Sequence, residues 1–376
     1  MDLGFLRPLY ESDSLVASVH LDTSRDTTDA DRAIELRWRH LRDELAELGT
    51  DEATLDALAE AVVERTSRAF GSHGQALFAS EGQLLDAHTL AVPPQRDSAT
   101  WMPVPDVLPL VVDRDRRVPY VLVALDRVHA KVFGYPAHPT HGAVSEDELT
   151  GEDTRGLDVE TRSGPGNRSG YNGRFANKYV QQELWRENTA AVAERIREAV
   201  AQVGAEVILV GGDDEAIAYL RENLGERRLT IPVRHIAGGR GGTDAEDRLH
   251  EAAEQALREF VVEKHDAFLA DYQEKLAHDQ AVKGTYETLP MLSEKRVETL
   301  VLGADRSQEP HLWGSVDEPS MVTSNPSKLG GPDSVFKAPA SAVMLRSAVM
   351  GHAAFTEMLD HGEPSGESGA TLRFPK

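Results

Sequence analysis

Apolar residues along this chain fall into two patterns, short continuous runs and stripes that recur every three or four positions. Short runs flanked by polar residues or glycine are typical of buried strands, and the stripes are typical of amphipathic helices. The runs predict strands at 14–21, 75–79, 118–125, 130–135, 206–212, 229–236, 299–302 and 370–374. The stripes predict helices at 29–48, 51–68, 175–200, 244–280, 282–292 and 340–359. We therefore expect an α/β (α+β) fold in which mixed sheets carry helices.

The order of these elements predicts three domains, each a mixed sheet with helices. The strands at 118–125 and 130–135 are close enough in sequence to form a hairpin, which restarts the pattern after a closing segment at 108–112. Gly238–Gly242 (GGRGG) is typical of a hinge, and the Pro-, Ser- and Gly-rich segment 303–339 is either functional or disordered. The expected domains are an N-terminal α/β domain at 1–115, a middle domain at 116–265 and a small C-terminal α/β domain at 266–376.

The charge distribution makes one stretch of the predicted middle domain unusual. The chain has 63 acidic and 40 basic residues, for a formal net charge of -23. Between Thr161 and Lys178, however, there is no Asp or Glu, whereas the segment 145–160 just before it is strongly acidic. The basic residues of the stretch are Arg162, Arg168, Arg174 and Lys178. Because nonspecific nucleic-acid binding needs a basic face, any RNA contact of this acidic protein should be local to such a stretch.

The same stretch is rich in glycine and poor in apolar side chains. Its glycines, which allow close approach of the backbone to a ligand, are Gly164, Gly166, Gly170 and Gly173. Asn167, Tyr171 and Asn172 add hydrogen-bonding groups and an aromatic ring ahead of a predicted helix, whose amino terminus favours phosphate. We therefore predict that 162–174 is a basic loop that contacts RNA. The composition also suits a plain flexible loop, and the sequence alone leaves both interpretations open.

Other chemistry is not indicated by the residues present. There is no Cys, which excludes disulfides and thiolate metal sites, and none of the 14 His residues stands at ligand spacing. We expect no metal and no cofactor. Asp213–Glu215 follow the strand at 206–212, where three carboxylates would repel phosphate and suit helix capping instead. The amino-terminal segment lacks the features of a signal peptide and no long apolar run occurs, so we expect a cytoplasmic protein without membrane contact.

Particular residues of the middle segment resemble a known family. Tyr120–Gly134 (YVLVALDRVHAKVFG), then Gly173-Arg174-Phe175 entering a helix, then the strand at 206–212 (EVILVGG) resemble the middle domain of archaeal and eukaryotic class-1 peptide release factors and of Pelota. The layout of the whole chain is similar to the bacterial branch of release-factor-like proteins, to which ribosome hibernation factors of the Balon type belong. The resemblance implies three domains arranged as in class-1 release factors and Pelota.

The chain departs from this family at the tip of the loop. Release factors carry Gly-Gly-Gln there, which assists attack of water on peptidyl-tRNA, but this chain reads GPGNRSGYNG at 164–173. Gln181 and Gln182 lie about two turns into the predicted helix. The resemblance therefore implies a factor that occupies the A site of idle or stalled ribosomes without peptide release and that has no catalytic residue. Implied partners are rRNA, P-site tRNA and elongation factor Tu; DNA is not expected.

Two other functions remain compatible with the sequence. The chain could be a peptidyl-tRNA hydrolase or ribosome rescue enzyme in which a divergent loop residue, Asn167 or Asn172, positions the water. It could also be an acidic stress protein that binds only other proteins.

Overall fold

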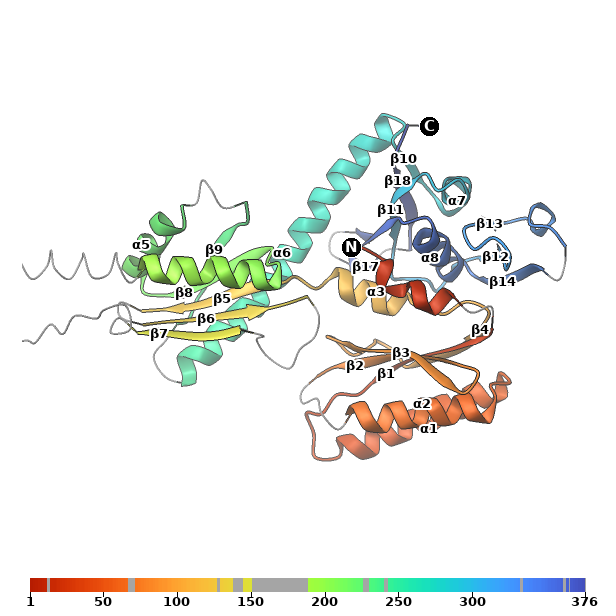
Figure 1. The fold of residues 1–376 in the computed structure, drawn as a ribbon, viewed down its shortest axis with the longest axis horizontal. Coiled ribbons are helices and arrows are strands. Elements are labelled where there is room, and N and C mark those ends of the chain that lie inside the picture. Colours follow the sequence, from red (N-terminus) through yellow and green to blue (C-terminus); the bar gives the residue numbers. More distant parts are fainter. Residues whose placement is uncertain are drawn as a thin grey trace, which may run out of the picture. The chain divides into compact units, whose positions relative to one another are not determined.

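The computed structural model describes residues 1–11, 14–66, 72–126, 129–137, 145–150, 189–225, 230–239, 243–331, 334–360, 363–364 and 366–375 (Figure 1). The chain divides into two compact units. Unit 1 combines Met1–Arg116 with Val262–Lys376, and unit 2 is Arg117–Val261. Both units contain helices and mixed sheets, which confirms the α/β (α+β) class predicted from the sequence. The division into three domains stays a prediction.

The amino-terminal half of unit 1 is a four-stranded antiparallel sheet with two helices on one face. Its strand order is β3-β2-β1-β4. The elements are β1 (Val16–Asp22), α1 (Ala30–Glu47), α2 (Glu52–Thr66), β2 (Gly74–Ser80), β3 (Gln83–Leu90) and β4 (Ser98–Met102). The sequence did not predict β3 and β4, because β3 is largely exposed and neither strand has the continuous apolar run of a buried strand.

Strand β1 is buried on both faces, although Ser18 and His20 interrupt its apolar residues. Ala17, Val19 and Leu21 pack against α1 and α2. Val16, on the opposite face, belongs to a second cluster that includes the first and last segments of the chain. Since successive strand side chains point to opposite faces, Ser18 and His20 lie on the same face as Val16, so this buried face is partly polar.

The carboxyl-terminal half of unit 1 contains a second four-stranded sheet and a small three-stranded sheet. The strand orders are β10-β18-β11-β15, in which β11 and β15 are parallel, and β13-β12-β14. The main elements are β10 (Ala281–Lys283), α7 (Thr285–Ser293), β11 (Val297–Leu302), β12 (His311–Ser315), β13 (Val322–Thr323), β14 (Val335–Pro339), α8 (Ala340–Met350), β15 (Ala354–Glu357) and β18 (Ser368–Leu372). Shorter elements are η1 (Gly4–Tyr10), η2 (Pro326–Lys328), β16 (Leu359–Asp360) and β17 (Glu363–Pro364).

The prediction of one helix over 340–359 is wrong beyond Met350. The Gly351 amide closes α8 by donating to Ser347 O at 2.8 Å, and His352 then takes a left-handed φ of 55°. The chain continues as β15, whose Phe355 is fully buried. The apolar residues after 350 therefore belong to a strand. The periodicity of a short apolar run does not distinguish a helix from a strand, so the sequence pattern alone could not show this.

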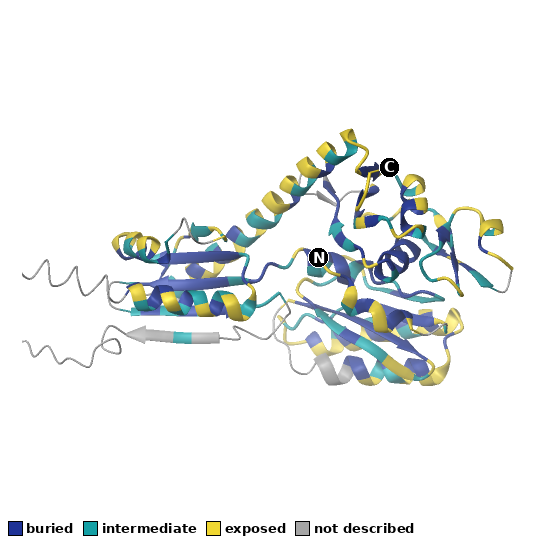
Figure 2. Cartoon of the chain, turned by 45° about the horizontal axis from the view of Figure 1, so that its top comes forward, coloured by how far each residue is buried: buried dark blue, intermediate teal, exposed yellow. Residues whose placement is uncertain are grey.

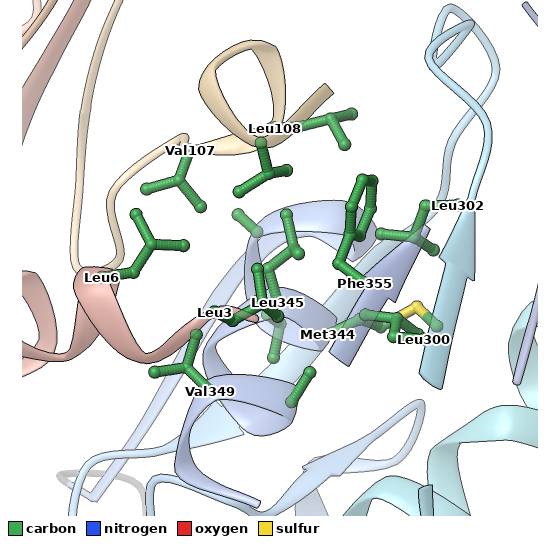
Figure 3. Packing of buried hydrophobic residues seen from close by; sticks show 14 of the residues in the cluster. Leu3, Leu6, Val107, Leu108, Leu300, Leu302, Met344, Leu345, Val349 and Phe355 are labelled. Carbon is green, nitrogen blue, oxygen red and sulfur yellow. The ribbon is translucent and has the colours of Figure 1, made fainter. Parts of the chain in front are cut away.

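One hydrophobic cluster joins the first and last segments of unit 1 (Figure 3). Leu3 and Leu6 come from the amino terminus, and Val107 and Leu108 from the start of α3 (Leu108–Asp115). They pack against residues of α8, β11 and β15, namely Met344, Leu345, Val349, Leu300, Leu302 and Phe355. Asp2 also forms an antiparallel bridge to Ala354. Residues more than 290 positions apart in the sequence thus share one core.

A buried polar network lies next to this core. The Asp115 carboxylate accepts from the Glu357 amide at 2.8 Å and lies 3.3 Å from His265 Nε2. Glu357, fully buried, accepts twice from the Arg116 guanidinium at 2.6 Å, and this hydrogen bonding raises the pKa of Arg116. Burial alone would raise the pKa of Asp115. The hydrogen bond from His265, the amino-terminal charge and the Glu357 amide outweigh burial and lower that pKa below its usual range.

Unit 2 is built on a five-stranded sheet with the order β7-β6-β5-β8-β9. Its strands are β5 (Tyr120–Leu125), β6 (His129–Tyr135), β7 (Ser145–Thr150), β8 (Val207–Gly212) and β9 (Val233–His235). The predicted hairpin is confirmed, since β5 and β6 pair antiparallel. Strands β5, β8 and β9 are parallel to one another. The strand predicted at 229–236 corresponds to β9, which spans only Val233–His235 among the described residues.

Helices cover both faces of this sheet. Val121, Val123 and Leu125 pack with the helix over 189–203 and with α5 (Asp214–Leu224). Leu122 and Ala124 pack on the other face with residues 249–261 of α6 (Thr243–Ala277). Figure 2 shows the result: the central strands are buried while the outer helix faces are exposed. The long helix predicted at 244–280 is thus confirmed as α6, and residues from 262 onward belong to unit 1.

The shared core of unit 1 predicts that its amino-terminal half does not fold alone. A fragment ending at Arg116 would leave Leu3, Leu6 and Leu108 without their partners, and each large core side chain loses about 2–5 kcal/mol when its packing is removed. We expect this fragment to lack a cooperative thermal transition in circular dichroism, whereas the full chain has one. A fragment that unfolds cooperatively would instead support an independent first domain.

The polar network predicts a loss of stability in acid. Because the folded pKa of Asp115 is depressed, the stabilisation from this carboxylate is present above the unfolded pKa of about 3.9 and is lost as the pH falls through the folded pKa. The unfolding free energy of Asp115→Asn should therefore differ most from the natural chain at neutral pH, with the gap narrowing below about pH 4. Asp266→Asn, an exposed neighbour of His265, is the control and should leave the pH profile unchanged. Urea titrations across pH 3–7 measure both; a pH-independent gap would contradict this role.

Candidate nucleic-acid interface

The residues that the sequence predicts to contact RNA lie outside the described residues. They are Arg162, Asn167, Arg168, Tyr171, Asn172, Arg174 and Lys178, with the glycines Gly164, Gly166, Gly170 and Gly173. Their role stays a prediction. The structure does describe the elements on either side, β7 and the helix over 189–203. The candidate interface is therefore built from the edge of the sheet to which these elements lead.

The first flank, β7, ends at the carboxyl edge of the parallel strands. In the register of the sheet Thr150 pairs with His129, and Ala130 pairs with Leu125 at the end of β5. Leu125 in turn pairs with Gly212 at the end of β8. Thr150, Leu125 and Gly212 thus lie along the same side of the sheet, where ligands commonly bind in open α/β sheets.

The second flank, the helix over 189–203, returns from the same edge. It ends beside the start of β8, where the Ala205 amide donates to Val200 O at 3.1 Å and the Glu206 amide donates to Pro119 O at 2.8 Å. Its length of about 22 Å matches a six-residue strand of about 20 Å, and Val192 and Ile196 pack on the sheet. The helix therefore begins near the carboxyl edge, so both ends of the segment 151–188 are attached there (Figure 1).

Polar contacts hold these two flanks in unit 2. Asp147 of β7 forms an ion pair with Arg195 of the helix, and Arg195 also pairs with Glu198. The hydrogen bonds that Arg195 donates to these two carboxylates raise the pKa of Arg195. Asn223 Nδ2 donates to Oγ1 of the buried Thr189 at 2.8 Å. Surface pairs of this kind contribute up to about 1 kcal/mol, enough to fix a register on a sheet that packing already stabilises.

The edge itself is acidic. Asp126 accepts from the His129 amide at 2.7 Å, and Asp213 caps α5 by accepting from the Glu215 and Ala216 amides at 3.1 and 3.2 Å. The capping role predicted for this acidic cluster is thus confirmed for Asp213. Asp214 lies 3.8 Å from His235 Nε2. Because these carboxylates would repel phosphate, the described edge can support an RNA-binding segment but is unsuited to bind phosphate by itself.

Close glycine packing fills the same edge. Gly212 has a φ of 141°, and a Cβ there would lie 1.7 Å from Leu125 O. A Cβ on Gly238 would lie 2.5 Å from the Leu249 amide nitrogen, and one on Gly239 would lie 2.9 Å from Gly212 Cα. The first two glycines of GGRGG are therefore needed for packing inside unit 2. The chain passes between the two units at 116/117 and at 261/262, not at this run, and the role of the run as a hinge stays a prediction.

Sequence reasoning missed Asp147 and Arg195 as supports of the interface. The segment containing Asp147 was read only as an acidic contrast to the basic loop, since its residues Ser145–Thr150 show no apolar strand pattern. Pairing with β6 makes it a strand. Arg195 lies outside the apolar residues of its helix, and no sequence signal links it to a residue 48 positions earlier.

The described part of the chain holds no group of three or more metal-ligating side chains. None of its helices is long and apolar enough to cross a bilayer.

Comparisons with known proteins agree with the resemblance seen in the sequence. Residues 119–278 match the model of bacterial archaeo-eukaryotic release factor family 2. The chain is 29% identical over 302 residues to two uncharacterized proteins of Mycobacterium tuberculosis, Rv2629 of strain H37Rv and MT2704 of strain CDC 1551; the match covers 79% of this chain and 77% of each relative.

Two solved structures match this chain at low TM-scores. Archaeoglobus fulgidus Pelota matches with a TM-score of 0.32 and 13% identity, covering 81% of this chain and 80% of Pelota. Dom34 of S. cerevisiae, a translation termination-like factor, matches with a TM-score of 0.40 and 9% identity over 81% of this chain and 80% of Dom34. At these TM-scores neither structure supports a functional argument, which rests on the family match and on the residues. Over residues 119–278 this chain is similar to bacterial archaeo-eukaryotic release factor family 2.

Proposed function

We propose that this protein is a ribosome-associated factor that occupies the A site of idle or stalled ribosomes, in hibernation or translational stress, without releasing peptide. One observation carries the proposal. Within the part of the chain that matches the release factor family model, residues 164–173 read GPGNRSGYNG where release factors carry Gly-Gly-Gln. The family context favours a ribosomal location, and the missing tripeptide argues against catalysis of release.

Charge supports RNA as the binding partner of this segment. Arg162, Arg168, Arg174 and Lys178 stand without an acidic residue among them in a chain of net charge -23. The sheet edge that anchors the segment presents Asp126, Asp213 and Asp214. The carboxylates of this edge attract the cationic segment and so compete with RNA for it. A surface with a high density of phosphate, such as rRNA or P-site tRNA, is therefore the RNA partner that this segment suits best.

Aromatic and amide groups would add to the electrostatic contacts. Tyr171 can stack on an unpaired base, and Asn167 and Asn172 can hydrogen-bond to a base edge. The resemblance to Balon-type proteins extends the proposal to elongation factor Tu as a partner on the ribosome.

The first test of this proposal is the double variant Arg168→Ala, Arg174→Ala. Each arginine that neutralises a phosphate releases counterions, so loss of two contacts should weaken cosedimentation with ribosomes and reduce the slope of log affinity against log salt by about two. The control is Arg32→Ala, Arg39→Ala, which removes the same charge from exposed positions of α1 and should leave affinity and slope unchanged.

The outcomes of this test separate RNA binding from protein binding. If the loop variant and the control cosediment equally and with equal salt dependence, the segment does not contact the ribosome. If the natural chain itself does not enter the ribosomal fractions of growing or starved cells, the chain acts on other proteins and the proposal fails.

A second test concerns catalysis. Hydrolysis of the peptidyl-tRNA ester needs a group that positions water and stabilises the oxyanion within a fraction of an ångström. The side-chain amides available in 164–173 are those of Asn167 and Asn172, which are one methylene shorter than Gln. We expect the purified protein to leave the ester of ribosome-bound peptidyl-tRNA intact over the time in which a release factor hydrolyses it.

The same assay identifies the competing enzyme. If peptide is released, and Asn167→Ala or Asn172→Ala abolishes release while cosedimentation persists, the protein is a hydrolase that uses a divergent loop and the non-catalytic reading is wrong.

A further inference from the structure

The three-stranded sheet of unit 1 has one buried face and one accessible face. On the buried face lie Leu312, Gly314, Phe336 and Ala338. A Cβ on Gly314 would lie 2.5 Å from Phe336 Cζ, so this face is tightly packed. Because strand side chains alternate, Trp313 points to the opposite side. The sheet therefore presents a large aromatic ring away from the core of the unit.

Trp313 occupies the centre of the accessible face. It lies on β12, the middle strand, and pairs in register with Thr323 on one side and with Lys337 on the other. The Lys337 ammonium lies 5.8 Å from the centroid of the indole ring. His311, which is exposed, precedes Trp313 by two residues and so points to the same side. The ring is half-buried and its neighbours across the strands are polar or cationic.

The charge around this face also departs from that of the chain. From Pro319 to Pro339 the sequence has two lysines, Lys328 and Lys337, and one acid, Asp333, whereas the whole chain has 63 acidic residues among 376. Both lysines are exposed. The exposed acids nearest in sequence, Asp317 and Glu318, follow the end of β12 that is remote from His311. A polyanion would therefore run along the side of His311 and Lys337.

We propose that Trp313 and Lys337 form a contact site for single-stranded RNA, in which the indole stacks on an unpaired base and the ammonium binds an adjacent phosphate. Base stacking on an aromatic side chain tolerates a polar, hydrated rim. A protein hot spot, in contrast, needs surrounding contacts that exclude water, and the neighbours of Trp313 on this face are a Lys and a Thr. This inference rests on the proposed function, because it assumes that the protein binds RNA. It adds a second contact with RNA that is far in sequence from 162–178.

The test measures binding of a fluorescein-labelled oligouridylate of about ten nucleotides, a length typical of single-strand sites, to the full chain by anisotropy. The full chain carries Arg168→Ala and Arg174→Ala, so that the basic loop does not dominate. Trp313→Ala should weaken binding about tenfold, while Trp313→Phe, which keeps an aromatic face, should retain most of it. Lys337→Gln should lower the slope of log affinity against log salt by about 0.7, the value for one phosphate contact on a single strand. Thermal unfolding of each variant confirms that it is folded.

The control is Trp101→Phe, a half-buried tryptophan of β4, which should bind as the parent does. Equal affinities of the parent and Trp313→Ala, or no binding of oligouridylate by the parent, overturn the inference. Either result leaves the proposed function intact if ribosome cosedimentation still depends on Arg168 and Arg174. Conversely, oligouridylate binding that depends on Trp313 in a chain that never cosediments with ribosomes supports this site and removes the ribosomal role.

Discussion

Burial of the parallel strands β5 and β8 on both faces is the constraint on which unit 2 depends. Helices cover the two sides of these strands, so Val121 and Val123 face one helical layer while Leu122 and Ala124 face the other. With both faces occupied, the open positions of the sheet are its ends. The connections that leave the carboxyl end are the natural place for a segment that contacts a partner. Both flanks of the segment 151–188 lead to that end.

The edge of the sheet is acidic, whereas the segment 162–178 that is attached to it is basic. This difference in charge would limit where the protein can bind RNA. The carboxylates of Asp126 and Asp213 accept hydrogen bonds from backbone amides of a turn and of a helix, so the fold fixes the positions of these side chains. A basic segment attached to such an edge would attract RNA, whereas the rest of this strongly acidic protein would repel it. Binding would then be confined to a surface dense in phosphate and would be sensitive to salt.

Anchoring and catalysis make different demands on this arrangement. Binding of a segment to the ribosome depends on the sum of many contacts, so several residues can each contribute part of the binding free energy. Catalysis of ester hydrolysis requires one group at one place, because activation of water depends on distance and direction. In the segment 162–178 four basic side chains are available for the first demand, whereas the Gly-Gly-Gln that would meet the second is not in its sequence. This is why the proposed function separates occupancy from release.

The sequence by itself determined the elements whose side chains report burial directly. Apolar runs predicted β1, β5 and β8, a long stripe predicted α6, and the acids after β8 predicted the Asp213 cap, because burial and capping impose local residue types. The basic composition of 162–178 was also visible without any structure. Strand β7 escaped prediction because it is polar, and β3 because its apolar residues form neither a continuous run nor a strict alternation. Both strands owe their conformation to pairing with a neighbour.

Only the tertiary structure decided how distant segments combine. Leu3 and Phe355 share one core, Asp115 and Glu357 share one network, and Asp147 pairs with Arg195. Nothing in the local sequence specifies such partners, since any apolar or oppositely charged side chain would suit the local pattern equally well. The partner is selected by the packing of whole elements, and that packing depends on the complete set of faces that must be buried at once.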